Sequence, residues 1–384
     1  MKKLLISLND FRHGGIPKCL HSLLKYIDKE KYSVDIICLD QDGPYKKEFN
    51  NLENCKVLQY NLFTKCICTF SSEIKQKGLL EKVGIVTSKI IWKLIKSLLK
   101  IDLLDLSIKK KAKKNSGEYD ICIAYAEGNC AKLIQGIGCK CKLIWIHNDY
   151  NFVPEAGDDT SFELFDKICC VSESTRIAFI QKYPNLANKT NTIYNLINHQ
   201  NIRQLANEKV YDANFTNDCF LIMSIGRISY QKQFTIIPDI AKHLIAKNVK
   251  FKWYIIGDGP ERSNLERKIE KYSLQETVIL LGKQDNPYKY LAQTDLYALT
   301  SIYESYPTVI NEALVLNIPI ISNDIPSIHE MIDETQGTIA PVETWDEDIY
   351  RIINGGKSSK NKKNMDFEAF NQNVMKKFYE LIES

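Results

Sequence analysis

Long apolar runs and a strong excess of one charge sign are both missing from this sequence. No stretch holds about 18 consecutive uncharged apolar residues, the length that a membrane-spanning helix needs. The first ten residues, MKKLLISLND, turn polar too soon for the apolar region of a signal peptide. The formal net charge of +4 over 384 residues gives no global electrostatic argument for nucleic-acid binding. These absences predict a soluble globular protein in the cytoplasm, without a nucleic-acid partner.

Metal-binding cysteine patterns are missing as well. The chain has twelve cysteines but no C-x₂-C pair, and several lie in apolar strand-like runs such as KICCVS. We therefore expect reduced structural thiols, including the closely spaced Cys66/Cys68, Cys139/Cys141 and Cys169/Cys170. The stretch DQDG at 40–43 allows an Asp-x-Asp metal interpretation, but a solvated turn is the preferred one.

Short β-branched runs alternate with helix-like segments along the chain, which is typical of parallel βαβ units. At 384 residues the chain is too long for one ordinary core. The pattern predicts an α/β protein with two doubly wound, Rossmann-like domains, at 1–200 and 215–365. We expect a last helix at 366–384 to pack back on the first domain. The polar segment 198–218 is the expected seam, with no apolar period to support a core element.

Candidate binding residues are those that directly follow strands, because ligands of open parallel sheets bind beyond the carboxyl ends of the strands. Gly14 and Gly15 lie between the first strand and a helix, where they let the backbone approach an anion. A plain turn is the alternative, and the missing G-x-G-x-x-G pattern argues against a dinucleotide site. His147 ends the strand KLIWIHN, either as a ligand contact or as a histidine that bonds the backbone.

The second half carries more of these candidates. In SIGRISYQK, Arg227 and Lys232 follow a strand and could hold a diphosphate, although surface charge is the alternative for either residue alone. Gly257 lies in the turn of YIIGDGP, where glycine removes bulk near a ligand. Lys283 follows the next strand, VILLGK, and is a further candidate contact.

The stretch ESYPTVINE at 304–312 places one glutamate before a helix and another inside it. Glu304 lies in the loop, and Glu312 lies about a turn and a half into the helix, where a carboxylate can accept bonds from two ribose hydroxyls. The helix N-terminus offers N–H groups and a positive dipole end to a phosphate. The alternative is a charge that favours the helix dipole, followed by a solvated glutamate. The candidate contacts between the two glutamates are Ser305, Tyr306, Pro307, Thr308 and Val309.

In order and spacing, SIGRISYQK, IIGDGP and ESYPTVINEALVLNIPIISND resemble the retaining glycosyltransferases of the GT-B type, family 4. The resemblance is strong over 219–345 and looser in the first half, through HGGIPK, WIHND, CCVSE and IYNLIN. It implies two domains facing each other across a cleft. It also implies roles for the site residues. Arg227 and Lys232 would hold the donor diphosphate, and Gly15 would face it. Glu312 would bind the ribose, Glu304 would bind the transferred sugar, and His147 would line the sugar site. The family usually reads E-G-F-P where this chain has Glu304-Ser305-Tyr306-Pro307, which leaves its usual sugar contacts open here.

The resemblance implies a retaining glycosyltransferase that needs no metal or other cofactor. We expect a hexose or N-acetylhexosamine donor, with UDP as the first choice of nucleotide and GDP as the second, and a glycan or lipid-linked acceptor. One group of alternatives comprises other GT-B enzymes, a nucleotide-sugar 2-epimerase or a glycan phosphorylase. Another is a non-catalytic subunit that binds nucleotide sugars.

A basic segment interrupts an otherwise mildly acidic chain. Residues 74–114 hold twelve lysines and three acidic residues, a local net charge of +9. Within it, Lys89, Lys93, Lys96 and Lys100 share one helix face, and Ile91, Leu94, Ile95 and Leu98 lie opposite. We expect residues 85–114 to contact an anionic membrane surface, which would make the protein peripheral at the inner face of the membrane. The alternative is a domain helix that packs its apolar face inward.

Overall fold

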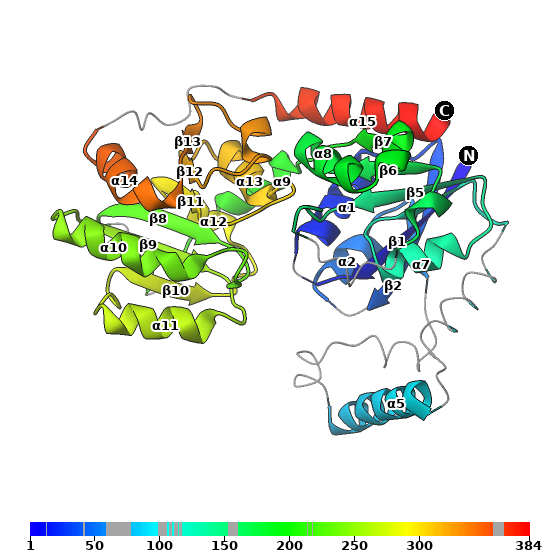
Figure 1. Cartoon of the computed structure of the whole chain (residues 1–384), viewed down its shortest axis with the longest axis horizontal. Helices are drawn as coiled ribbons and strands as arrows, with labels where there is room; N and C mark the ends of the chain where they lie inside the picture. Colours follow the sequence, from blue (N-terminus) through cyan, green and yellow to red (C-terminus); the bar gives the residue numbers. More distant parts are fainter. Residues whose placement is uncertain are drawn as a thin grey trace. The chain divides into compact units, whose positions relative to one another are not determined.

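The computed structural model describes most of the chain as two compact units. The described residues are 1–12, 14–40, 43–58, 78–98, 106, 110, 114, 117–152, 160–212, 214–216, 218–355 and 365–384. Unit 1 comprises Met1–Leu196 with Asn371–Ser384, and unit 2 comprises Ile197–Phe370. Each unit is built on its own parallel sheet with helices on its faces (Figure 1). Within the described residues, no helix has both the length and the apolar content to cross a bilayer.

The sheet of unit 1 has seven strands in the order β3-β2-β1-β4-β5-β6-β7, and every neighbouring pair is parallel. Its strands are β1 (Lys2–Asp10), β2 (Tyr32–Asp40), β3 (Cys55–Leu58), β4 (Ile121–Ala124), β5 (Cys141–Ile146), β6 (Lys167–Cys170) and β7 (Thr190–Thr192). Its helices are α1 (Gly15–Tyr26), α2 (Tyr45–Asn50), α5 (Leu79–Leu98), α7 (Asn129–Gln135), α8 (Glu173–Lys182) and the C-terminal α15 (Phe367–Glu383), with 3₁₀ turns at Phe162–Leu164 and Pro184–Lys189. The central strands are buried on both faces, which explains their continuous apolar runs.

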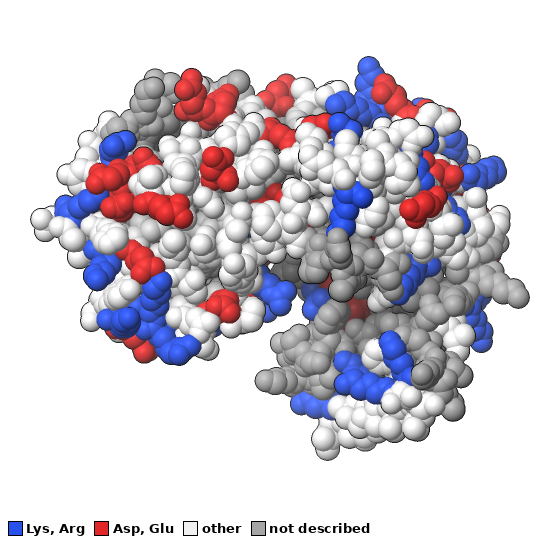
Figure 2. All heavy atoms as spheres, in the orientation of Figure 1, with Lys and Arg blue, Asp and Glu red and all other residues white. Residues whose placement is uncertain are grey.

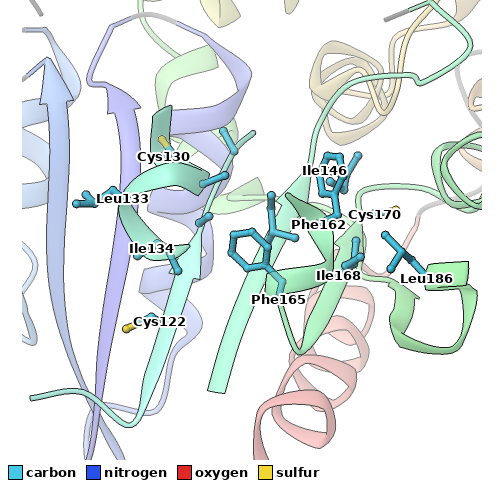
Figure 3. Close-up of a cluster of buried hydrophobic side chains, with 14 of the residues drawn as sticks. Cys122, Cys130, Leu133, Ile134, Ile146, Phe162, Phe165, Ile168, Cys170 and Leu186 are labelled. Atoms are coloured by element: carbon cyan, nitrogen blue, oxygen red, sulfur yellow. The ribbon is translucent and has the colours of Figure 1, made fainter. Parts of the chain in front are cut away.

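One hydrophobic core cluster of unit 1 contains side chains from α7, from the strands β4 and β6, and from the segment that precedes β6. Leu133 and Ile134 of α7, Cys122 of β4, and Phe162 and Phe165 all belong to this cluster and are labelled in Figure 3. Cysteine acts here as a small apolar side chain. The ten cysteines among the described residues are free thiols, whereas Cys66 and Cys68 lie outside that part of the chain.

Helix α15 packs on the sheet of unit 1 through aromatic side chains. Tyr379 stacks on Tyr32 with ring centroids 5.6 Å apart, and Phe378 lies against Trp145 at 5.8 Å. The Tyr32 hydroxyl donates to Glu383 Oε1 at 2.7 Å. The last residues of the chain therefore complete the fold of unit 1.

The sheet of unit 2 has six parallel strands in the order β10-β9-β8-β11-β12-β13. They are β8 (Phe220–Ile225), β9 (Phe251–Ile256), β10 (Val278–Gly282), β11 (Leu296–Leu299), β12 (Ile320–Ser322) and β13 (Gly337–Ile339). The helices are α9 (His199–Ala206), α10 (Ile237–Ala246), α11 (Arg262–Lys271), α12 (Tyr288–Leu291), α13 (Thr308–Val315) and α14 (Trp345–Ile353), with 3₁₀ turns at Phe234–Ile236, Ile328–Glu330 and Val342–Thr344. Trp253 and Trp345 are fully buried in its core.

The strand order reverses once in each sheet, between β1 and β4 in unit 1 and between β8 and β11 in unit 2. Ligands of doubly wound sheets bind at this reversal, just beyond the carboxyl ends of the strands. A ligand site is therefore expected in the loops after these four strands.

Two expectations from the sequence were wrong. The polar segment 198–218 does contain a core-supporting element, α9, which buries His199 and Ile202 and packs beside α12 and α13. Asp40 is the last residue of β2 and is buried, so it does not belong to a solvated turn. Helix α9 was not predicted because it buries only two side chains, which is too few to produce a helical period of apolar residues in the sequence.

Candidate active site

The loops after β8 and β11 in unit 2 are bonded to one another at the strand reversal. The Ile302 N–H donates to the Gln231 carbonyl at 2.8 Å, and the Gln231 side chain donates to the Tyr303 carbonyl at 3.0 Å. The Thr300 hydroxyl donates to the Lys232 carbonyl at 2.6 Å. These bonds fix the backbone on either side of Lys232 and so hold its side chain against the second loop.

Lys232 and Glu304 form an ion pair between these two loops. The Glu304 side chain is nine-tenths buried, and the Lys232 side chain is also largely shielded. Ser301 donates a second bond to the same carboxylate, from Oγ to Glu304 Oε1 at 2.7 Å. A charged pair of this kind is stable away from water only when its groups are bonded, and the two donors on Oε1 supply that bonding for the Glu304 carboxylate. The sequence singled out both charged residues but gave no sign that they touch.

Glycines let the β8 and β9 loops approach at backbone distance. A Cβ on Gly257 would lie 1.8 Å from the Gly226 carbonyl oxygen, and one on Gly259 would lie 2.2 Å from the Ile228 carbonyl oxygen. Gly257 also has a φ of +144°, which other residues rarely adopt. The space that Gly257 leaves is thus filled by Gly226 of the neighbouring loop. Gly257 shapes the β8 loop that carries Arg227 and Lys232.

Helix α13 starts directly after the β11 loop. It begins at Thr308, with Pro307 at the preceding cap position in an extended conformation and no side-chain cap. Glu312 is buried in this helix, with 4% of its surface exposed. Burial raises the pKa of Tyr297 on β11 well above its usual value, and the nearby carboxylates of Glu312 and Glu304 raise it further. The charges of both glutamates of the 304–312 stretch therefore act on Tyr297.

The other candidates of unit 2 differ in exposure. Arg227 is exposed after β8, and Lys283 is exposed after β10. Tyr306 and Pro307 are buried, whereas Ser305, Thr308 and Val309 are half-buried. The loops after β8 and β11 with the start of α13 bring together a fixed lysine, an exposed arginine, two buried carboxylates and an uncapped helix N-terminus. Such a combination suits an anion joined to hydroxyl-bearing groups.

In unit 1, Gly14 and Gly15 stand where β1 leads into α1. A Cβ on either glycine would meet no atom within 4 Å, so packing does not require glycine at these two positions. Gly15 is the first residue of α1, and that helix has no side-chain cap. Its first N–H groups therefore lie in an open loop.

His147 follows β5 and is held as a neutral ring. Burial lowers the pKa of His147 to about 3, although a bond to the backbone of Tyr125 opposes the shift. Its Nε2 atom is buried without a hydrogen-bond partner among the described residues. Glu127, after β4, accepts the backbone N–H groups of His147 and Asn148, both at 3.2 Å. Glu127 was not among the residues predicted from the sequence, although it directly follows a strand in AEGN, as the other candidates follow theirs.

The part of the chain that holds this site is similar to known glycosyltransferases. Residues 208–370 match the family model of the glycosyl transferases group 1. The chain is 32% identical over 165 residues to an uncharacterized glycosyltransferase, MJ1059, of Methanocaldococcus jannaschii, covering 42% of this chain and 41% of that protein. It is 26% identical over 328 residues to a Campylobacter jejuni enzyme, N-acetylgalactosamine-N,N'-diacetylbacillosaminyl-diphospho-undecaprenol 4-alpha-N-acetylgalactosaminyltransferase, covering 84% of this chain and 81% of that protein.

Among solved structures, Anabaena Alr3699/HepE in complex with UDP and glucose aligns with a TM-score of 0.71 at 17% identity, over 99% of this chain and 100% of that one. At that identity the alignment concerns the fold, and the fold is GT-B: two Rossmann-like α/β domains. The chain thus has the GT-B fold and is similar in sequence to glycosyltransferases. The segment that matches the glycosyl transferases group 1 model contains both Lys232 and Glu304.

Proposed function

We propose that the protein transfers a hexose or N-acetylhexosamine from a UDP-sugar to a hydroxyl of a glycan or a lipid-linked saccharide, with retention of the anomeric configuration, in the synthesis of a cell-surface polysaccharide. The observation that carries the proposal is the ion pair between half-buried Lys232 and buried Glu304 at the strand reversal of unit 2. UDP is preferred to GDP because the HepE structure, which has the same fold, is a complex with UDP and glucose.

In this proposal unit 2 stabilises the leaving diphosphate. Lysine has three N–H donors, so Lys232 can keep Glu304 as a partner and still donate to a phosphate oxygen. Arg227, exposed after β8, adds a planar fork that matches phosphate geometry. The uncapped start of α13, at Thr308 and Val309, contributes N–H groups and the positive end of the helix dipole. Charge that develops on the leaving group meets donors that are already in place, which lowers the barrier without a protein nucleophile or a metal ion.

The remaining binding roles follow the resemblance. Glu312 accepts the ribose hydroxyls, and Glu304 accepts hydroxyls of the transferred sugar. His147 contributes a neutral ring, whose pKa of about 3 rules out a charged imidazole at physiological pH. Gly14 and Gly15 keep their assignment to the diphosphate, because the open start of α1 supports an anion contact.

A lipid-linked acceptor is the preferred choice, and helix α5 supports it. The Campylobacter relative is named for a diphospho-undecaprenol substrate. Of the α5 side chains, only Ile85 is buried, whereas Leu79, Leu80 and Leu98 are 78%, 90% and 77% exposed. Val83, Val86, Ile90, Ile91 and Leu94 are also exposed. An apolar face this open argues against inward packing of the helix.

Lysines accompany that apolar face. Lys82, Lys89, Lys93 and Lys96 lie on α5, and Figure 2 shows basic residues beside uncharged surface in this region. Lys100 and most of 109–114 lie outside the described residues. A helix with leucines and isoleucines on one face and lysines on another suits the boundary of an anionic membrane, so we propose a peripheral location at its inner face.

A donor screen tests the proposed reaction. The full chain is incubated with UDP-glucose, UDP-galactose, UDP-N-acetylglucosamine, UDP-N-acetylgalactosamine and the corresponding GDP-hexoses, with lipid-linked and free saccharide acceptors, and nucleotide release is measured. Acceptor-dependent UDP release, with an α-linked product from an α-linked donor, is the expected result. Donor binding without release under any acceptor would favour the non-catalytic subunit instead. Release of UDP with a free 2-epimeric sugar and no glycoside would favour the epimerase.

A further inference from the structure

The carboxylate of Glu304 is bonded on one oxygen only. Lys232 Nζ and Ser301 Oγ both donate to Oε1, the hydroxyl at 2.7 Å. No side chain in the described part of the chain donates to Oε2. With both donors on Oε1, the second oxygen keeps its capacity to accept bonds from a ligand.

The backbone that carries Ser301 and Glu304 is fixed from the segment after β12. Asn323 donates from its side-chain amide to the Ser301 carbonyl at 3.0 Å. Ser327 donates from its hydroxyl to the Glu304 carbonyl at 2.8 Å. Ser301 and Ser327 are 0% and 1% exposed, so water does not replace these bonds. The position of the carboxylate therefore depends on the Ser301 hydroxyl rather than on movement of the loop.

We propose that Ser301 is a positioning residue for the sugar half of the donor. The inference rests on the proposed function, in which Lys232 also bonds the diphosphate. When the diphosphate draws on Lys232, Ser301 keeps Oε1 in place, and Oε2 stays aimed at the hydroxyls of the transferred sugar. A hydroxyl suits this task because it can donate to a carboxylate without adding a charge that would compete with Lys232 for the phosphate.

Ser301→Ala tests the proposal, and Ser322→Ala is its matched control. Ser322 is equally buried, and its hydroxyl donates to a backbone carbonyl, that of Asn323, at 2.9 Å. Affinities of the parent and both variants are measured by calorimetry for UDP alone and for the four UDP-sugars of the donor screen. The best-bound donor is then used for kcat and KM. We expect Ser301→Ala to bind UDP as the parent does but to bind the donor on the order of 10-fold more weakly. Ser322→Ala should change neither affinity.

A double-mutant cycle separates positioning from a general loss of structure. If Ser301 acts through Glu304, Ser301→Ala should have no further effect on donor affinity in a Glu304→Ala background. Additive losses, or an equal loss of UDP and donor affinity, would overturn the proposal. If Ser301→Ala does not fold, Ser301→Cys keeps most of the volume with a weaker donor and should show the same selective loss. A parent that binds none of the four donors would instead refute the proposed function itself.

Discussion

Glu127 Oε1 accepts the backbone N–H groups of both His147 and Asn148, each at 3.2 Å. The carboxylate follows β4, and the two N–H groups follow the neighbouring strand β5. One side chain thus fixes the loop that presents the His147 ring, whose Nε2 atom has no partner in the described part of the chain.

Glu127→Ala should loosen that loop without touching unit 2. Two part-buried backbone N–H groups lose their acceptor, so we expect a loss of about 1 kcal/mol in stability. Transfer should fall on the order of 10- to 100-fold because the histidine is no longer held in place. UDP affinity, measured by calorimetry, should not change. Glu127→Gln keeps an acceptor oxygen and is the control; a full loss of transfer in that variant would show that the charge, not the bond, matters.

Lys232→Ala removes the donor proposed to stabilise the leaving diphosphate. Since that charge develops mainly in the transition state, turnover should fall by about 100-fold or more. Lys247→Ala is the control, because Lys247 also forms ion pairs, with Asp346 and Glu347, but belongs to the surface beside α14. If the Lys232→Ala variant folds and has the parental kcat, the proposed role of Lys232 in stabilising the leaving diphosphate is wrong.

The two glutamates of the 304–312 stretch should have separable effects. Glu312→Gln should weaken binding of bare UDP, because its carboxylate is assigned to the ribose. Glu304→Gln should spare bare UDP and impair use of the full sugar donor. Calorimetry with UDP alone decides between them, and equal losses in both variants would contradict the assignment.

Buried histidines should make stability depend on pH. Burial lowers the pKa of His147 to about 3 and that of His21 to about 4. The unfolded chain takes up these protons below about pH 6.5, whereas the folded chain does not until near those lower values, so stability falls as pH falls through that window. Each histidine contributes a slope of up to about 1.4 kcal/mol per pH unit.

Denaturant unfolding between pH 7 and pH 4.5 tests this pH dependence. His147→Asn should lower the slope of the unfolding free energy against pH by nearly the value for one proton, about 1.4 kcal/mol per pH unit. A loss of stability that is the same at every pH does not affect this slope. His329→Asn is the control, because His329 is exposed and pairs with Asp324. An unchanged slope in His147→Asn would mean that the ring is protonated in the folded protein.

The sequence predicted the alternating strands and helices, and hence two parallel sheets, because long buried strands leave apolar runs. It did not predict β7, whose three residues are polar, or α9, which buries only two side chains. For the site, the sequence identified the charged residues and glycines that directly follow strands as candidates. The contacts among them were not predicted, because Ser301 to Glu304 and Gly257 to Gly226 depend on loop geometry that no local pattern encodes. Glu127 follows a strand, as the other candidates do, but its role was not predicted because the sequence does not show which acid bonds backbone N–H groups.

Helix α5 should bind vesicles that contain anionic lipid, through its exposed apolar face and its lysines. Each lysine near such a surface contributes on the order of 1 kcal/mol, so Lys89→Gln, Lys93→Gln and Lys96→Gln together should weaken sedimentation with these vesicles about 100-fold. Lys242, Lys250 and Lys271 are exposed in unit 2, and changing them to Gln removes the same charge as a control. Binding of the parent should also weaken as salt rises through the screening range. Donor affinity should stay constant in both triple variants. If the α5 triple variant and the unit 2 triple variant lose vesicle binding equally, the effect depends on net charge and not on α5. If sedimentation does not depend on the charge of the lipid, the proposed binding of α5 to an anionic membrane is wrong.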